Sequence, residues 1–291
     1  MSQEYYDLAL PPRRVPWSVR SQLLLGGFSN QFGWLFFGFS MIFMWLFGFN
    51  ADLSSIMFAL SRVETAPGEI MLVEQTNASE NDTPIYAYTY SFRVERLEKQ
   101  YQGVSYTTGH GFGSEQKVVV EYLADDPTIS RIQGARRAQF SPWVFCFVPI
   151  LPLIGLGFAA FGLRNGLKAN ALLATGKIGR GVLKSRQATN VRINNRTVYK
   201  LTFEFTADDG QRYKTVSKTH QPELLQDDAE ERLLYHPTNP AYAVMLDNLP
   251  GAPDIDELGQ IRPLPVYSAG LVLIIPVLAI LINATVLILS L

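Results

Sequence analysis

The sequence has very little cysteine and almost no net charge. Its 291 residues include a single cysteine, Cys146, so an intrachain disulfide cannot form. This excludes the class of small secreted domains that depend on disulfides. Because Cys146 lies in an apolar run, we expect it to be a small packing residue. The formal net charge of −1 provides no general attraction to nucleic acid.

Formal charge is also absent from three long stretches, residues 21–51, 142–163 and 263–291. All 25 basic and 26 acidic residues lie in the rest of the chain. A soluble globular protein distributes charge over its whole surface, whereas membrane proteins segregate it. The distribution argues against a soluble enzyme and a disordered chain, and it indicates an integral membrane protein.

These runs predict three transmembrane helices, because a bilayer core needs about 20 apolar helical residues. We place the helices at residues 32–50, 142–163 and 266–291. Residues 1–31 form an N-terminal segment, with a short interfacial helix expected over 19–28. The first apolar run is too long and begins too late for a cleaved signal peptide.

Small residues in the second predicted span have the spacing of close helix packing. Gly155 with Ala159, and Gly162 with Gly166, are four positions apart, which places each pair on one helix face. The alternative interpretation is that small residues are common in such helices without marking a contact.

Polar and helix-bending residues in the spans are few. Pro149 and Pro152 in the second span, and Pro276 in the third, predict kinks because proline removes a backbone donor. Asn283 lies deep in the third span, where we expect it to face another helix; a transport role is the alternative. No Asp, Glu, Lys, Arg or His occurs in any predicted span, which argues against a pump or transporter but leaves an oligomeric pore open.

Basic residues near the spans predict the orientation, because cytoplasmic loops carry an excess of Lys and Arg. Nine lie beside the N-terminus and residues 164–262, namely Arg13, Arg14, Arg20, Arg164, Lys168, Lys177, Arg180, Lys184 and Arg262. Four lie beside residues 52–141, namely Arg62, Arg131, Arg136 and Arg137. We therefore expect a multi-pass protein of the cell (inner) membrane, with the N-terminus and residues 164–262 in the cytoplasm.

The segments 52–141 and 164–262 both show the alternation of strands with one covered face. The apolar positions are Tyr86, Tyr88, Tyr90, Phe92 and Val94 in the first segment, and Tyr199, Leu201, Phe203 and Phe205 in the second. We predict two small, mostly β domains of about five strands, each forming a barrel or a sandwich.

The two segments also repeat one motif in the same order. The matches are Ala66-Pro67-Gly68-Glu69-Ile70 with Ala174-Thr175-Gly176-Lys177-Ile178, Tyr88-x-Tyr90-x-Phe92 with Tyr199-x-Leu201-x-Phe203, Tyr101-Gln102-Gly103-Val104-Ser105 with Tyr213-Lys214-Thr215-Val216-Ser217, and Tyr122–Pro127 with Tyr235–Pro240. Four matches in a fixed order indicate an internal repeat. With three spans between and around them, the copies are expected on opposite sides of the membrane.

A β unit beside a membrane helix with these motifs resembles the DUF3592 family, a domain of unknown function in membrane proteins. The passage Arg164-Asn165-Gly166-Leu167-Lys168 and Leu172-Leu173-Ala174-Thr175-Gly176 is similar to the family's transition from helix to first strand. The resemblance covers roughly residues 60–250 in two copies, and the first copy departs from it at 95–100 and 109–113. It implies membrane association and small β domains, and it implies no catalytic residues.

The three histidines do not form a recognisable metal motif. His110, His220 and His236 show no His-x-x-x-His spacing, so we predict no zinc site and assign no metal ligand. His110 lies in a glycine-rich loop, residues 109–113, that lacks the Lys-Ser/Thr and the helix of a phosphate-binding loop. We interpret it as a hairpin loop and assign no cofactor-binding residue.

Acidic and hydroxyl groups also have structural interpretations. The acidic cluster Asp227, Asp228, Glu230 and Glu231 lacks the spacing of a calcium loop, so we expect the wet face of a short helix over 222–231. Asp125-Asp126 is interpreted as a turn. Ser105 and Ser217 recur in both copies outside any Gly-x-Ser-x-Gly motif, which favours strand residues over nucleophiles. We therefore assign no catalytic residue.

Two surface features point outward from the β domains. Arg180, Lys184, Arg186, Arg192 and Arg196 form a basic group that either binds anionic lipid headgroups or is simply a solvated strand edge. Asn77-Ala78-Ser79 fits a glycosylation acceptor on the outer side.

Taken as a sequence, the chain is best interpreted as a non-enzymatic accessory or scaffold protein of the membrane, in contact with the lipid bilayer and with other membrane proteins or further copies of itself. Its β domains would bind partners through exposed strand edges. One alternative is a membrane enzyme subunit whose pocket joins Ser105, His110 and Asp125. Another is an oligomeric channel or lipid-handling element.

Overall fold

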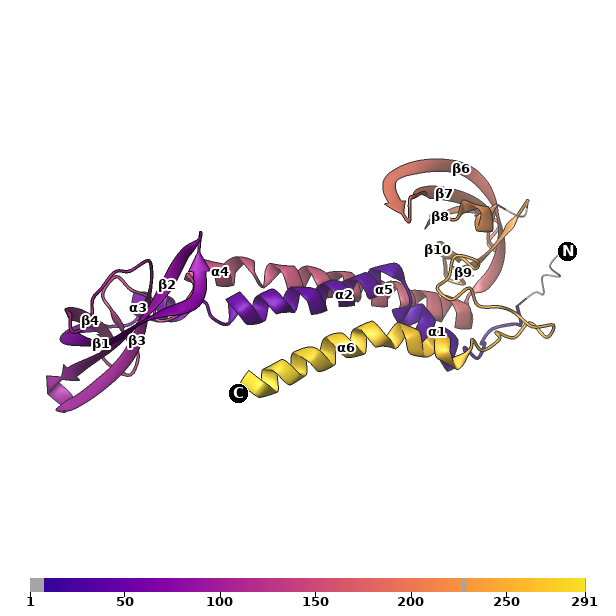
Figure 1. Cartoon of the computed structure of the whole chain (residues 1–291). Coiled ribbons are helices and arrows are strands. Elements are labelled where there is room, and N and C mark those ends of the chain that lie inside the picture. Colours follow the sequence, from indigo (N-terminus) through magenta and orange to yellow (C-terminus); the bar gives the residue numbers. More distant parts are fainter. Residues whose placement is uncertain (1–7, 227–228, 291) are drawn as a thin grey trace. The chain divides into compact units, whose positions relative to one another are not determined.

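The computed structural model describes residues 8–226 and 229–290, which form two compact units. One unit is Phe39–Leu153, and the other holds the described residues before and after it. Three helices are long and apolar enough to cross a membrane, at Phe28–Gly48, Pro142–Thr175 and Val266–Ser290. Two open, five-stranded antiparallel sheets complete the fold (Figure 1).

Three helices that are long and apolar enough to cross a membrane overlap the three predicted spans, with different limits. A short helix α1 (Trp17–Leu25) comes first, near the expected interfacial helix. The first span is α2 (Phe28–Phe43), which continues through a π-helical turn at Met44–Gly48. The third is α6 (Val266–Ser290), which contains Pro276.

The second span is interrupted at its proline. Helix α4 (Pro142–Phe147) ends before Pro149, and α5 (Ile150–Thr175) follows. The break confirms the interruption predicted for Pro149, whereas Pro152 lies in the first turn of α5, where a missing backbone donor is tolerated. Helix α5 also continues beyond residue 163, so residues 164–175 are helical and do not belong to the second sheet.

Glycines bring α2 and α5 into backbone contact, as the small-residue spacing predicts. A Cβ added at Gly155 would lie 2.6 Å from the backbone nitrogen of Phe37, and one at Gly162 would lie 2.5 Å from that of Asn30. At Gly166 the nearest atom would be the Leu23 carbonyl oxygen, at 2.2 Å. These distances leave no room for a side chain, so the helices approach closely only because the residues are small.

Amide side chains connect the three helices. Asn30 is fully buried, and its Nδ2 donates to the Ala159 carbonyl at 2.9 Å. Gln31 Nε2 donates to the Val272 carbonyl on α6 at 2.8 Å. Asn283, expected to face another helix, donates to the carbonyl of Ala279 in its own helix at 2.8 Å. Side chains that satisfy polar groups within the bundle are typical of helices packed in lipid.

The first sheet has the strand order β3-β2-β1-β4-β5. Its strands are β1 (Val63–Glu80), β2 (Thr83–Val94), β3 (Lys99–Thr108), β4 (Lys117–Leu123) and β5 (Ser130–Ile132), with a helix α3 (Ser54–Leu60) before them. The predicted alternation is confirmed on β2, because Tyr88, Tyr90, Phe92 and Val94 are buried in the core. Burying such side chains contributes about 1.5–3 kcal/mol each.

The second sheet has the same topology, with the order β8-β7-β6-β9-β10. Its strands are β6 (Lys177–Ile193), β7 (Arg196–Thr206), β8 (Arg212–Thr219), β9 (Glu231–His236) and β10 (Asn239–Met245). Two five-stranded sheets with one connectivity agree with the predicted internal repeat. The helix expected over 222–231 was wrong: only Pro222–Leu225 is helical, as a 3₁₀ turn, and Asp227 and Asp228 lie outside the described residues.

Strand register corrects the alignment of the two copies. Gly68 pairs with Phe92 as Gly181 pairs with Phe205, so Gly68 corresponds to Gly181 and not to Gly176. The same register matches Tyr90 with Phe203, two residues from the predicted partner. Gly176 instead follows the last turn of α5. The other two matches, Tyr101 with Tyr213 and Tyr122 with Tyr235, are confirmed by equivalent pairings.

Neither sheet closes by a continuous ladder, so each is an open sheet and not the expected barrel or sandwich. In each copy a serine side chain forms a hydrogen bond across the opening. In the first copy, Ser105 Oγ on β3 accepts a hydrogen bond from the backbone nitrogen of Ile132 at 2.9 Å. In the second, Ser217 Oγ on β8 accepts from Asn248 Nδ2 at 2.7 Å. The recurring serine therefore links β3 to β5 in the first copy, and β8 to the segment after β10 in the second.

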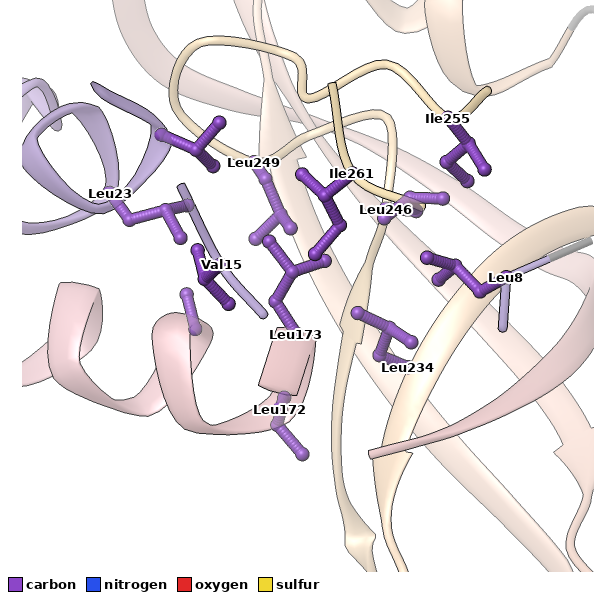
Figure 2. Packing of buried hydrophobic residues seen from close by; sticks show 12 residues of the cluster. Leu8, Val15, Leu23, Leu172, Leu173, Leu234, Leu246, Leu249, Ile255 and Ile261 are labelled. Atoms are coloured by element: carbon purple, nitrogen blue, oxygen red, sulfur yellow. The ribbon is translucent and has the colours of Figure 1, made fainter. Parts of the chain in front are cut away.

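A hydrophobic cluster joins the second sheet to the helices (Figure 2). It combines Leu23 of α1, Leu172 and Leu173 at the end of α5, Leu234 of β9, and residues of the segment after β10. Arg13 crosses this junction, and its Nη1 donates to the carbonyls of Leu173 at 3.1 Å and Gly176 at 2.9 Å. The guanidinium thereby satisfies carbonyls at the C-terminus of α5.

Candidate functional site

The three polar residues considered for an enzyme pocket do not converge. Ser105 is fully buried, and its Oγ is already used by the backbone of Ile132. His110 contacts the ring of Tyr86, with a centroid distance of 5.0 Å. Asp125 lies in the loop after β4. Within residues 8–226, no hydrogen bond joins Ser105, His110 and Asp125 to one another.

The glycine-rich loop is not the expected hairpin loop, because it connects β3 to β4, which are not neighbours in the sheet. Its backbone groups are nevertheless engaged. The Gly111 nitrogen donates to the Tyr88 hydroxyl at 2.8 Å, and the Gly113 nitrogen donates to Gln116 Oε1 at 2.8 Å. Gly109 donates to the carbonyl of Pro84 at 2.8 Å. A loop that binds phosphate needs such nitrogens directed at the ligand, so this loop has a structural role.

The acidic turns also have local partners. Asp126 Oδ1 accepts from the backbone nitrogen of Thr128 at 3.1 Å, as expected for the predicted turn. Glu231 is buried at the start of β9, and Glu230 is exposed. Among the described residues, no group of three or more His, Cys, Asp or Glu side chains is arranged to hold a metal ion.

Cys146 was expected to be a small packing residue, and this prediction was wrong. It is exposed on α4. Its place in a helix long enough to cross a membrane means that an exposed side chain there faces lipid when the helix is inserted.

The feature that the two sheets share is a long first strand that is paired on both sides over only part of its length. Strand β4 pairs with Val63–Glu69 of β1, whereas β2 pairs with β1 as far as Glu80. Likewise, β9 pairs with Lys177–Gly181 of β6, whereas β7 continues to Ile193. Residues 71–80 and 182–193 therefore have one strand edge that no described strand covers. We call these two segments the free edges.

The free edges carry opposite charges. The first contains Glu74 and Glu80 and no basic residue; Arg136 Nη1 lies 2.9 Å from Glu80 Oε1. The second contains Lys184, Arg186 and Arg192 and no acidic residue. Equivalent parts of one fold thus present different electrostatic surfaces to a partner.

The basic free edge lies beside a cavity. Arg186 stacks on the ring of Tyr199 at 4.1 Å and donates to Gln226 Oε1 at 3.1 Å. Arg186, Arg196, Tyr199 and His220 contribute to the lining of a cavity of about 680 Å³. Four of the five residues in the predicted basic group lie on β6, and Arg196 begins β7. The sequence was sufficient to predict the basic charge of this surface. It did not predict the unpaired backbone of β6, because that depends on where β9 ends.

Tyr235 supports the opposite end of the second sheet. Burial, together with its hydrogen bond to Asp208 Oδ1 at 2.7 Å, raises the pKa of Tyr235 to about 12. Lys177 pairs with the same carboxylate, and this contact lowers the pKa of Asp208. The group joins β6 to β9 at the pairing of Lys177 with Tyr235, so it is structural.

No protein-family model matches the sequence, and no curated protein matches it. The resemblance to the DUF3592 family is therefore not confirmed by these comparisons. The structure itself shows the three apolar helices and the two similar sheets.

Proposed function

We propose that this chain is a non-enzymatic accessory protein of the membrane that binds protein partners by strand addition at its free edges. The observation that carries the proposal is the incomplete pairing of β1 and β6 in both copies. An unpaired edge offers a row of backbone donors and acceptors, to which an extended peptide can add as a further strand.

The charge of each edge defines the chemistry of its partner. On β6, Lys184, Arg186 and Arg192 favour an extended segment with acidic side chains. Lys184 Nζ lies 3.6 Å from Glu204 Oε1, and the Lys184 side chain is half-exposed. On β1, the glutamates favour a segment that is neutral or basic.

Photo-crosslinking in intact membranes tests partner binding. A photoreactive residue at Val191, which is exposed on the free edge of β6, should give a discrete protein adduct. The matched probe at Leu258 is also exposed but lies in the segment between β10 and α6, and it should give none. A probe at Met71 tests the edge of β1 in the same way. The proposal is wrong if neither edge gives an adduct beyond that at Leu258.

The proposal includes a cytoplasmic N-terminus and copies on opposite sides of the inner membrane. The excess of Lys and Arg beside the N-terminus and residues 164–262 supports this orientation. Topology reporters fused after Phe140 and after Leu249 should give opposite signals. Equal signals would mean that the number of crossings between these sites is even.

A further inference from the structure

A second cavity lies where the helices meet the second sheet, away from the free edges. Its volume is about 280 Å³, and residues of α1, α2, α5, β8 and β10 all contribute to it. The residues that matter here are Leu23, Phe28, Val216, Asn165, Lys218 and Asn248. They combine an apolar wall with groups that donate hydrogen bonds.

The sequence places this cavity at the boundary between lipid and water. Helix α2 begins its apolar run at Phe28, and α5 gains its first charges, Arg164 and Lys168, beside the lining residue Asn165. The Phe28 side chain is 68% exposed and that of Val216 is 50% exposed, so an apolar surface adjoins the cavity. Lipid headgroups occupy this depth, with acyl chains on the span side.

The charge of the lining selects one class of headgroup. Lys218 is the cationic residue of the lining, and among the described lining residues there is no Asp or Glu. Within residues 8–226 and 229–290, no ion pair neutralises Lys218. A phosphate can therefore pair with the ammonium, whereas a choline or ethanolamine group would find no carboxylate.

The remaining polar groups and the size of the cavity fit a small headgroup. Asn248 is held in place by donating to Ser217 Oγ at 2.7 Å, and Asn165 is exposed beside it in the lining. A volume of about 280 Å³ suits a small headgroup such as phosphoglycerol and not a whole lipid. The acyl chains would then lie outside, along the exposed ring of Phe28.

We propose that this cavity binds the headgroup of an anionic glycerophospholipid, with the phosphate on Lys218 and the headgroup hydroxyls on Asn165 and Asn248. This inference does not depend on the free edges, because none of the lining residues belongs to them. The proposed contact with lipid lies at the junction of the second sheet and the helices, and it depends on the chemistry of the headgroup.

Native mass spectrometry of the full-length protein in detergent tests the site by titration with phosphatidylglycerol and with phosphatidylcholine of the same acyl chains. The wild type should bind phosphatidylglycerol more tightly. Lys218→Gln should weaken that binding by about fivefold, the effect of one basic residue at a membrane surface. Lys214→Gln is the matched control, because Lys214 is exposed on the same strand but does not line the cavity.

A second variant and a soluble competitor keep the outcome decisive. Val216→Trp places a large ring at the half-exposed wall of the cavity and should also weaken phosphatidylglycerol binding. Glycerol 3-phosphate should not displace the lipid, because it lacks the acyl chains. The proposal is overturned if both variants bind phosphatidylglycerol like the wild type, if the two lipids bind equally, or if glycerol 3-phosphate displaces the lipid.

Discussion

Gly33 on α2 lies directly against Ala159 on α5: a Cβ added at Gly33 would come within 2.3 Å of the Ala159 backbone nitrogen. No side chain larger than hydrogen fits at that distance. The neighbouring Asn30 donates to the carbonyl of the same Ala159, so close approach and hydrogen bonding reinforce each other at one point of the bundle. In lipid, where water does not drive apolar helices together, such contacts hold the bundle.

Two glycines on one helix test this packing. Gly162→Ala should lower the melting temperature in detergent, because its Cβ would lie 2.5 Å from the Asn30 backbone nitrogen. Overpacking of this kind costs about 1–3 kcal/mol. Gly157→Ala is the control, since its Cβ would meet nothing within 4 Å. Alanine favours helix over glycine, so Gly157→Ala should be neutral or stabilising. Equal effects of the two changes would contradict the packing.

The recurring serines predict unequal effects of the same substitution. Ser105→Ala leaves the buried backbone nitrogen of Ile132 without its acceptor, at a cost of about 1–3 kcal/mol. Ser217→Ala should cost less, because Asn248 Nδ2 is a side-chain donor that can rotate toward water. Chemical denaturation in detergent measures both, with Ser114→Ala, at an exposed loop position, as the control. A smaller loss for Ser105→Ala than for Ser217→Ala would contradict this account.

Asp52 predicts acid sensitivity in the first unit. Its buried carboxylate accepts from Ser55 Oγ at 2.8 Å and from the backbone nitrogen of Arg137 at 3.2 Å. Burial alone would raise the pKa of Asp52, but these hydrogen bonds and that of Ser54 outweigh it and lower the pKa below the ordinary value of 3.8. The stabilisation is therefore present above that value and lost as the pH falls through the lowered pKa.

Asp52→Asn should destabilise the protein near neutral pH, by about 1.5–3 kcal/mol for hydrogen bonds to a charged group. The difference from the wild type should shrink as the pH falls below about 4. Thermal melting in detergent across this range measures it. The exposed turn variant Asp82→Asn is the control. A difference that stays constant through the acid range would show that the carboxylate charge is not what stabilises this contact.

Arg13 predicts a capping effect at the end of α5. Arg13→Met removes the donors to the carbonyls of Leu173 and Gly176 but keeps an apolar stem over the cluster of Figure 2. We expect a loss of about 1–2 kcal/mol, in the range of a charged group at a helix end. Arg14→Met, at an exposed position, should have no measurable effect on the melting temperature. If Arg14→Met were the more harmful change, the capping assignment would be wrong.

Alternation and charge were sufficient to predict much of the fold. The charge-free runs define the three apolar helices because length and apolarity are local properties of the chain. The spacing of Tyr88, Tyr90 and Phe92 defines a buried strand face for the same reason. The alignment of the copies was only half correct, because an alternating aromatic strand looks the same when it is shifted by two residues.

The sequence by itself therefore determined the spans, the strands and the repeat, since each follows from a periodicity that neighbouring residues share. Tertiary structure decided where pairing stops on β1 and β6, because that depends on the shorter lengths of β4 and β9. It also decided that Cys146 is exposed and that Lys218 and Asn165 line one cavity. Such contacts join residues far apart in the chain, and only packing between elements determines which of them meet.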